Sequence, residues 1–562
     1  MLDHLDLNPA LLEAERPADD MPSEFAACLN ALGSYCTERF VLRLSPRVHR
    51  LVDEAPKGIY STDTLNAETI QAYSTYLHET VHWWQHIGSS AGLVLSLVHP
   101  AQAHQNSERL VEFIQRVGPK KSVKRWAELT ALSGETISSN RGLAVANVSV
   151  NNAVDLESYK IVALNPNRGV LGSTMGSRYF ESVGHCYWMA YAQVVGLPQA
   201  TVDREEKHLP DARHWDQPFR EVRAAGIEGW VHGEPVRMPP FGLYALFEGQ
   251  ARLIQLQYLT FGVARPPTCK ELEKRGYFNG VYGEALKFFL ETTGTPWPRT
   301  VDDPVVALFL LVVDLAINPT AGFPLDIKSY ENLILDVDPG VRFLRLTQVV
   351  AKRPELRKLI TRYSREEYFE VTGILIEGCG YEHPAIALQA VAAWPREMDG
   401  VAAILKEKET FRFEPANLVM RVLFSHYASF CTDKLARPEF FCWPGAWMAG
   451  ERVGEASQRL FLKYLSLFTD RADSEEIVPR LIPGAQPADL TRTLSIFYGN
   501  IIVYDLTRQW ILQDGPFCYR FNWLSKTHPE AKTAEWAGSM FESAYGVHPD
   551  RFDVASLPYA AS

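Results

Sequence analysis

The stretch from Asn66 to Gly88 reads NAETIQAYSTYLHETVHWWQHIG. Asn66 is a good N-cap and Gly88 a good residue to follow the last turn, so we expect a helix from about Ala67 to Ile87. Glu79 is the only residue with a formal charge from Thr69 onward in this stretch. A helix facing solvent would carry more charge, so the pattern predicts a buried helix.

This helix contains the motif His78-Glu79-Thr80-Val81-His82. Two histidines four residues apart share one helix face, and their neutral imidazoles can hold one divalent cation, most simply Zn²⁺. Glu79 lies about 100° around the helix from His78, where it can reach a water bound to the metal without binding the metal itself. The pattern therefore predicts hydrolysis by an activated water with Glu79 as general base. The alternative is a pair of core histidines bonded to neighbouring polar groups.

The surrounding residues resemble the extended signature of the zincin metallopeptidases. Thr75 stands where that family favours Val or Thr, Tyr76 and Trp83 are uncharged, and Trp84 is apolar.

A third ligand is needed, and His86 is too far along the helix to serve, about 12 Å from His78. We expect His86 either to line the cleft or to pack as a polar core residue. The better candidate is Glu248, a lone carboxylate in an apolar run that is costly to bury unless it is paired or bound to metal. Gly249 would let its helix approach the first one closely. An ion pair with Arg252 is the alternative.

The segment Glu248-Gly249-Gln250-Ala251 resembles the E-G-x-A helix of the gluzincins. The resemblance covers two short segments, and many gluzincins place this glutamate closer to the histidines. It implies that His78, His82 and Glu248 bind Zn²⁺ and that Glu79 is the base.

Hydrolysis also needs a group that stabilises the developing oxyanion, and further residues can support the ligands. Asp314 lies in the otherwise apolar run from Val305 to Ile317 and could accept a hydrogen bond from the second ring N–H of a ligating histidine. Glu181 is a reserve ligand. The candidates for oxyanion, substrate or supporting roles are His86, His185, His232, Tyr244 and Asp314.

The 562 residues carry a net charge of -11, which argues against binding to nucleic acids or anionic membranes. Eight cysteines form no C-x-x-C pair, as expected of free thiols in a reducing compartment. The first residues lack an apolar segment, so we expect no signal peptide and a cytoplasmic protein.

The predicted fold class is α+β and predominantly helical, with a small sheet beside the metal-binding region and a large helical C-terminal region. The expected regions are residues 1–60, a catalytic region 61–265 and a helical region 266–562, with a further division near 450.

Along the chain we expect a strand at Phe40–Leu44 and two more at Leu143–Val150 and Tyr159–Leu164. A helix is expected from Arg178 to Val195, and Pro304–Ile317 is expected to be a buried core helix rather than a membrane span.

Residues 197–240 are expected to form a long loop. Near its end, Pro239-Pro240 introduces an apolar helix of about Phe241–Thr260.

The sequence thus predicts a zinc metallopeptidase acting on a protein or peptide. Control by a regulatory partner, by oligomerisation, by residues 197–240 acting as a lid, or by narrow specificity is a hypothesis.

Two His and one carboxylate also form the facial triad of non-haem iron enzymes. Glu79-x-x-His82 matches the unit of di-iron bundles, although the only other such unit is Glu205 to His208. The third alternative is a binding or regulatory protein with a non-catalytic site.

Overall fold

The computed structural model describes residues 2–4, 33–36, 39–54, 66–166, 172, 176–228, 230–231, 234–521, 523–524 and 530–554. Within them the helices are α2 (Pro46–Asp53), α3 (Ala67–Gly88), α4 (Ser90–Val117), α5 (Val123–Leu132), α6 (Arg141–Leu164), α8 (Val183–Val202), α9 (Asp216–Ala224), α10 (Leu243–Phe261), α11 (Cys269–Lys274), α12 (Val281–Thr293), α13 (Pro304–Ile317), α14 (Leu333–Val337), α15 (Pro339–Lys352), α16 (Arg365–Cys379), α17 (Ala385–Glu397), α18 (Asp399–Thr410), α19 (Leu418–Ala436), α20 (Pro438–Cys442), α21 (Pro444–Trp447), α22 (Glu455–Lys463), α23 (Pro487–Leu512) and α24 (Glu530–Tyr545). The strands are β1 (Leu2–His4), β2 (Gly33–Cys36), β3 (Val41–Leu44), β4 (Lys120–Lys121), β5 (Trp230–Val231), β6 (Glu234–Pro235), β7 (Val263–Arg265), β8 (Phe468–Arg471), β9 (Ser474–Pro479) and β10 (Asp553–Val554).

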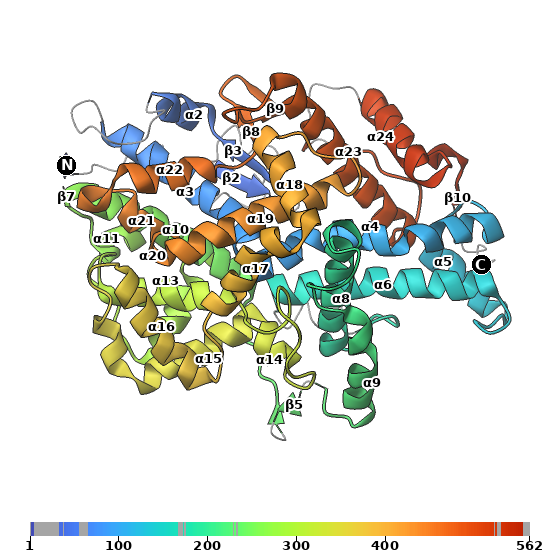
Figure 1. The fold of residues 1–562 in the computed structure, drawn as a ribbon, viewed down its shortest axis with the longest axis horizontal. Coiled ribbons are helices and arrows are strands. Elements are labelled where there is room, and N and C mark those ends of the chain that lie inside the picture. The colour runs from blue at the N-terminus through green and yellow to red at the C-terminus, as the bar shows by residue number, and fades with distance from the viewer. Residues whose placement is uncertain are drawn as a thin grey trace.

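The fold is α+β and predominantly helical, as the sequence predicts (Figure 1). One four-stranded sheet has the order β2-β3-β8-β9. Its two hairpins are antiparallel, and β3 and β8 join them in parallel with Val41 opposite Phe468. The sheet therefore combines a strand pair near the start of the chain with one from the C-terminal region.

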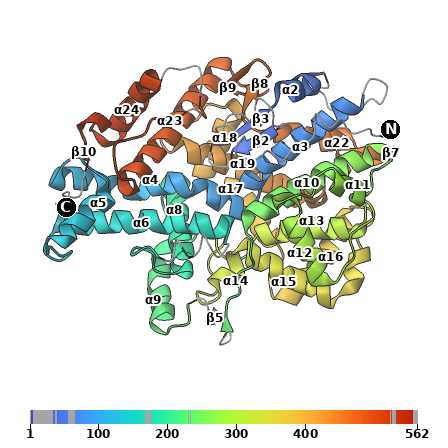
Figure 2. The same cartoon turned by 180° about the vertical axis from the view of Figure 1, so that it is seen from behind.

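Helix α3 lies at the centre of the molecule, and every residue from Thr69 to Gly88 is buried. Asn66 caps it as predicted, because its side chain accepts a hydrogen bond from the backbone N–H of Thr69 at 2.8 Å. Helices α2, α4, α10 and α19 pack around α3, together with β2 and β3. In both views α3 runs beside α10 (Figures 1 and 2). The predicted buried helix is confirmed.

The hydrophobic core is continuous and includes side chains from all three regions expected from the sequence. Helix α13 is its most apolar element, buried from Val305 to Ile317, and Asp303 caps it. Where a domain boundary falls stays a prediction. No helix in the described ranges has the length and apolar character needed to cross a bilayer.

Two predicted strands are wrong, because Leu143–Val150 and Tyr159–Leu164 both belong to helix α6. Asn140 caps this helix through a hydrogen bond from the backbone N–H of Leu143. Helix α6 packs against α4 and α8, and Val145, Val150 and Val162 are buried. Tertiary packing has overridden the local strand propensity of this segment.

The helix predicted at Arg178–Val195 begins at Val183 and continues through Gly196 and Pro198 to Val202. Gly196 lies inside the helix and not at its end, and a Cβ atom there would lie 2.6 Å from the side chain of Gln105 on α4. Its small size lets the two helices approach each other.

The excursion at 197–240 is partly ordered rather than one long loop. It contains α9 and the short 3₁₀ helix Ala212–Trp215, whose Trp215 side chain is fully buried. The strand at Phe40–Leu44 is confirmed as β3, and the helix predicted after Pro240 is α10.

Candidate metal centre

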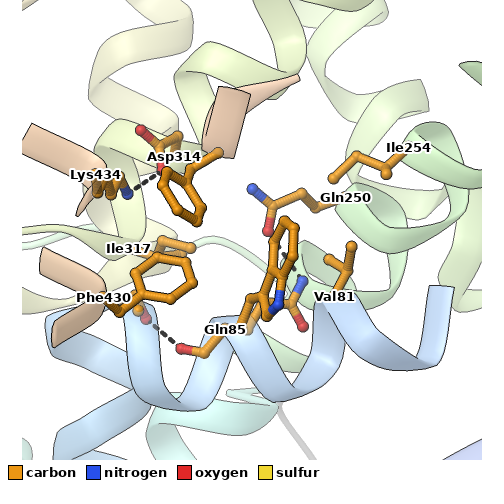
Figure 3. Close-up of a pocket in the computed structure, with 12 residues that line it drawn as sticks. Val81, Gln85, Gln250, Ile254, Asp314, Ile317, Phe430 and Lys434 are labelled. Carbon is orange, nitrogen blue, oxygen red and sulfur yellow. Dashed lines mark hydrogen bonds and ion pairs between the residues drawn. The ribbon is translucent and has the colours of Figure 1, made fainter. Parts of the chain in front are cut away.

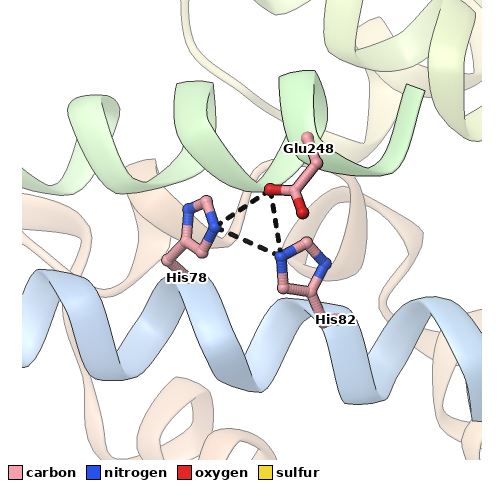
Figure 4. A group of neighbouring side chains, drawn as sticks. All are labelled: His78, His82 and Glu248. Carbon is pink, nitrogen blue, oxygen red and sulfur yellow. Dashed lines mark hydrogen bonds and ion pairs between the residues drawn. The ribbon is translucent and has the colours of Figure 1, made fainter. Parts of the chain in front are cut away.

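Helices α3 and α10 pack antiparallel and bring distant parts of the sequence together. Near the start of α3, the hydroxyl of Ser74 lies 3.3 Å from the side-chain nitrogen of Gln255, late in α10. Near the end of α3, the amide nitrogen of Gln85 donates to the backbone carbonyl of Phe247, early in α10. Between these contacts Glu248 faces the histidines of α3 (Figure 4).

The side chains of His78, His82 and Glu248 converge on one point. The two Nε2 atoms are 3.2 Å apart. Oε2 of Glu248 lies 3.5 Å from Nε2 of His78 and 3.4 Å from Nε2 of His82. Three ligands of a tetrahedral ion with metal–ligand bonds of about 2.1 Å would be about 3.4 Å apart, whereas neighbouring ligands of an octahedral ion would be about 3.0 Å apart. The observed triangle therefore has the size of a site for one metal ion.

The two histidines of the triangle are buried, and Glu248 is partly exposed. The side chain of His78 is 3% exposed and that of His82 10%, whereas Glu248 keeps 18% of its side chain exposed. Among the residues that the structure describes, these three form the whole His/Cys/Asp/Glu group. A tetrahedral ion bound here would therefore have a fourth position for water or substrate.

The electrostatics of the cluster favour a positive charge. Burial lowers the pKa of His82, but the carboxylate of Glu248, with further contributions from Glu79 and Gln85, raises the pKa to about 9. Burial raises the pKa of Glu248, but His82 and His78 together hold the pKa of this carboxyl well below its ordinary value. The cluster thus stabilises one cationic charge, here a proton on His82.

Glu79, the predicted base, lies on α3 beside the cluster and is 2% exposed. Its carboxylate is near enough to contribute to the raised pKa of His82. The sequence also allows an ion pair between Glu248 and Arg252, and the structure shows two other contacts of Arg252. The guanidinium of Arg252 lies over the ring of Tyr282, 4.1 Å from its centroid, and donates to Gln255.

His86 packs as a polar core residue. Its Nδ1 atom lies 2.9 Å from the hydroxyl of Ser96 on α4, and its ring contacts Phe40 and Phe247 edge-on. Burial, with a smaller effect of His82, lowers the pKa of His86 to about 3. His86 is therefore neutral. These contacts support its packing as a polar core residue rather than a place in the lining of the cleft.

Asp314 does not accept a hydrogen bond from a ligating histidine. Its carboxylate forms a buried ion pair with Lys434 at 2.6 Å and accepts hydrogen bonds from Tyr368 and Asn318 (Figure 3). The helix that carries Asp314 has no basic residue to pair with it. The partner, Lys434, comes from the distant helix α19, so the sequence could not reveal this ion pair. The supporting contact to His82 comes instead from Gln85, whose Oε1 lies 2.8 Å from Nδ1.

Gly249 does not face α3 as expected. A Cβ atom at this position would make ordinary contacts with Tyr282 and Ala285 of α12 and with Phe309 of α13. The residue that the sequence missed on this side is Tyr282, whose ring centroid lies 6.1 Å from that of His78.

The candidates for oxyanion stabilisation are dispersed. Tyr244 lies one turn before Glu248 on α10 and is 51% exposed. His185 of α8 pairs instead with Asp155 of α6 at 3.2 Å, outside the three-residue group. Glu181, the reserve ligand, forms an ion pair with Arg223. His232 lies outside the described residues.

Comparisons of the chain with protein-family models, curated proteins and solved structures give no match. The class of the protein is therefore defined by its own fold and site. It is a helix-rich α+β protein with a His-His-Glu cluster between two antiparallel helices.

Proposed function

We propose that the protein is a zinc-dependent hydrolase that cleaves a peptide or amide bond. The observation that carries this proposal is the triangle of Nε2, Nε2 and Oε2 atoms, with edges of 3.2, 3.4 and 3.5 Å and one exposed corner. The order of the residues in the sequence supports it, because a glutamate directly follows the first histidine, where a general base is needed.

A zinc ion in this triangle would lower the pKa of a bound water to about 7 and polarise the scissile carbonyl. His78, His82 and Glu248 would hold the ion, and Glu79 would accept the proton of the attacking water and deliver it to the leaving amine. The burial of Glu79 supports this role, since few water molecules can compete for its carboxylate. Tyr244, one turn before Glu248 on α10 and half exposed, is a candidate for binding the substrate or the oxyanion.

An alternative with the same ligands is a non-haem iron enzyme. Iron of this type is also bound by two histidines and one carboxylate, so the same three residues could hold it. A di-iron bundle has less support, because Glu205 and His208 lie in an exposed turn after α8. A sealed structural site has less support because of the exposed corner at Glu248.

The test is metal analysis of the purified protein together with an assay on a peptide library and an unfolded protein. We expect one zinc per chain and cleavage that a chelator abolishes and added zinc restores. Iron with an oxygen-dependent product would overturn the proposal. Zinc without hydrolysis of any peptide or amide would support a non-catalytic metal site instead. Rapid cleavage of many unfolded substrates without a trigger would contradict the hypothesis that the activity is restrained.

A further inference from the structure

Gln85 connects His82 to the helix that carries Glu248. It lies on α3, one turn after His82, and is 3% exposed. Its Oε1 atom is 2.8 Å from Nδ1 of His82. Its Nε2 atom is 2.9 Å from the backbone carbonyl of Phe247 and 2.9 Å from Oε1 of Gln250, both on α10. Three contacts thus use the oxygen and the nitrogen of one amide.

The carbonyl of Phe247 decides which way this amide points. A backbone carbonyl can only accept, so the atom of Gln85 that faces it must be the NH₂ group. The oxygen of Gln85 then faces His82, and Nδ1 of His82 must carry a hydrogen to donate to it. This leaves Nε2 as the nitrogen of His82 that can offer a lone pair to a metal.

We propose that Gln85 is the positioning residue of the metal centre, which fixes the tautomer and ring orientation of His82 and ties them to the turn of α10 that presents Glu248. The inference rests on the proposed metal-dependent function. Phe247, which anchors Gln85, directly precedes Glu248, so one side chain sets the geometry of two ligands from different helices. Contacts of this kind orient a ligand without touching the metal.

The partner of His82 is an amide and not the carboxylate that often supports metal-bound histidines. The local geometry requires this, because a carboxylate at position 85 would place an oxygen against the carbonyl of Phe247 with no hydrogen between them. A neutral acceptor also leaves the imidazole less basic than a carboxylate would. The metal would therefore stay more electrophilic, which suits the activation of water.

A pocket of about 20 Å³ is lined by Gln85, Gln250 and Lys434 (Figure 3). It has room for one water molecule. Truncation of Gln85 to alanine would let water enter and replace the missing acceptor, so alanine is a poor test. Methionine has a similar length and no hydrogen-bonding group, and it is the better replacement.

The test measures zinc affinity by competition with a chelator, and ligand geometry from the visible spectrum of the cobalt(II) form. We expect Gln85→Met to weaken zinc binding by about 10- to 100-fold and to alter the cobalt spectrum. The control is Gln255→Met, which removes a glutamine from the same interface, where it contacts Ser74, Thr75 and Arg252 rather than a ligand. We expect the control to retain the wild-type affinity and spectrum.

Gln85→Glu separates the contact to His82 from the contacts to α10, because it keeps an acceptor for His82 and removes the donors to α10. A carboxylate makes His82 more basic and also repels the carbonyl of Phe247, so the cobalt spectrum of Gln85→Glu should differ from that of the wild type. If Gln85→Met does not fold, Gln85→Glu carries the test, and its cobalt spectrum must differ from that of the wild type. Wild-type affinity and cobalt spectrum in the folded Gln85 variants would overturn the inference while leaving the metal centre intact. A wild-type protein that binds no zinc would overturn the proposed function itself.

Discussion

Nε2 of His82 on α3 lies 3.4 Å from Oε2 of Glu248 on α10. The contact joins two helices that are far apart in the sequence, and it places a carboxylate at the third corner of a site whose first two corners lie on one helix face.

Replacement of the base should separate metal binding from catalysis. Glu79→Gln removes the proton acceptor and keeps the size of the side chain, so we expect hydrolysis to fall by about 100- to 10,000-fold with zinc content unchanged. The control is Glu68→Gln, which removes an exposed carboxylate from the first turn of the same helix, where it pairs with Arg47. Hydrolysis that persists in Glu79→Gln would contradict the mechanism.

Removal of any corner of the triangle should remove the metal. We expect His82→Ala and Glu248→Ala to lose bound zinc, measured by elemental analysis after dialysis, because two remaining ligands hold a zinc ion weakly. His86→Gln is the matched control, since His86 is a buried histidine of the same helix whose partner is Ser96. It should be less stable and still bind one zinc. Loss of zinc from His86→Gln alone would contradict the assignment of ligands.

Zinc binding should compete with a proton on His82. The pKa of His82 is raised to about 9, after burial is outweighed by Glu248, so a metal ion must displace a proton from Nε2 at neutral pH. We expect the affinity for zinc to rise about tenfold per pH unit between about pH 7 and pH 9 and then to level off. Calorimetry in buffers of different ionisation enthalpy measures the released proton. Binding that releases no proton at pH 7 would disagree with this prediction.

Acid should destabilise the fold through its buried histidines. Burial, with a smaller effect of Lys408, lowers the pKa of His426 to about 3, from an ordinary value of 6.5. Between these values the unfolded chain binds a proton that the folded protein does not, so stability is complete above about pH 6.5 and is lost as the pH falls towards 3.

The difference in unfolding free energy between pH 7 and pH 4 should therefore be smaller in His426→Leu than in the wild type. The exposed His214 provides the control, because His214→Leu should leave this difference unchanged. Urea unfolding at the two pH values makes the comparison. An equal pH dependence in all three proteins would show that His426 is not responsible.

The ion pair between Asp314 and Lys434 should matter for stability and not for metal binding. Asp314→Asn leaves the buried ammonium group of Lys434 without a counter-charge, so we expect a loss of about 3–5 kcal/mol in unfolding free energy. The double replacement Asp314→Leu with Lys434→Met should be less destabilising, since no charge stays buried. Both variants, where folded, should bind zinc normally. Weakened zinc binding in the double variant would restore a supporting role for Asp314 at the metal centre.

Much of the candidate site could be predicted from local patterns. The spacing of His78 and His82 places them on one face of any helix, and Glu248 stood out because a lone carboxylate in an apolar helix needs a partner. The N-cap was predictable for the same reason, since Asn66 accepts from a backbone N–H of its own first turn, whereas Gly88, expected to follow the last turn, is the last helical residue and Ser89 is the C-cap. Local geometry and the cost of burial are properties that a sequence carries directly.

The parts that could not be predicted depend on which helices become neighbours. Residues of α6 with strand propensity became helical because α4 and α8 offer them a packed surface. Asp314 pairs with Lys434 because α13 and α19 approach each other in the fold. Gln85 contacts His82 while it is held by Phe247, which lies on the distant helix α10. The sequence by itself determined that His78, Glu79 and His82 would share a buried helix. The antiparallel packing of α10 on α3, set by the burial of two apolar surfaces together, decided that Glu248 would complete the triangle.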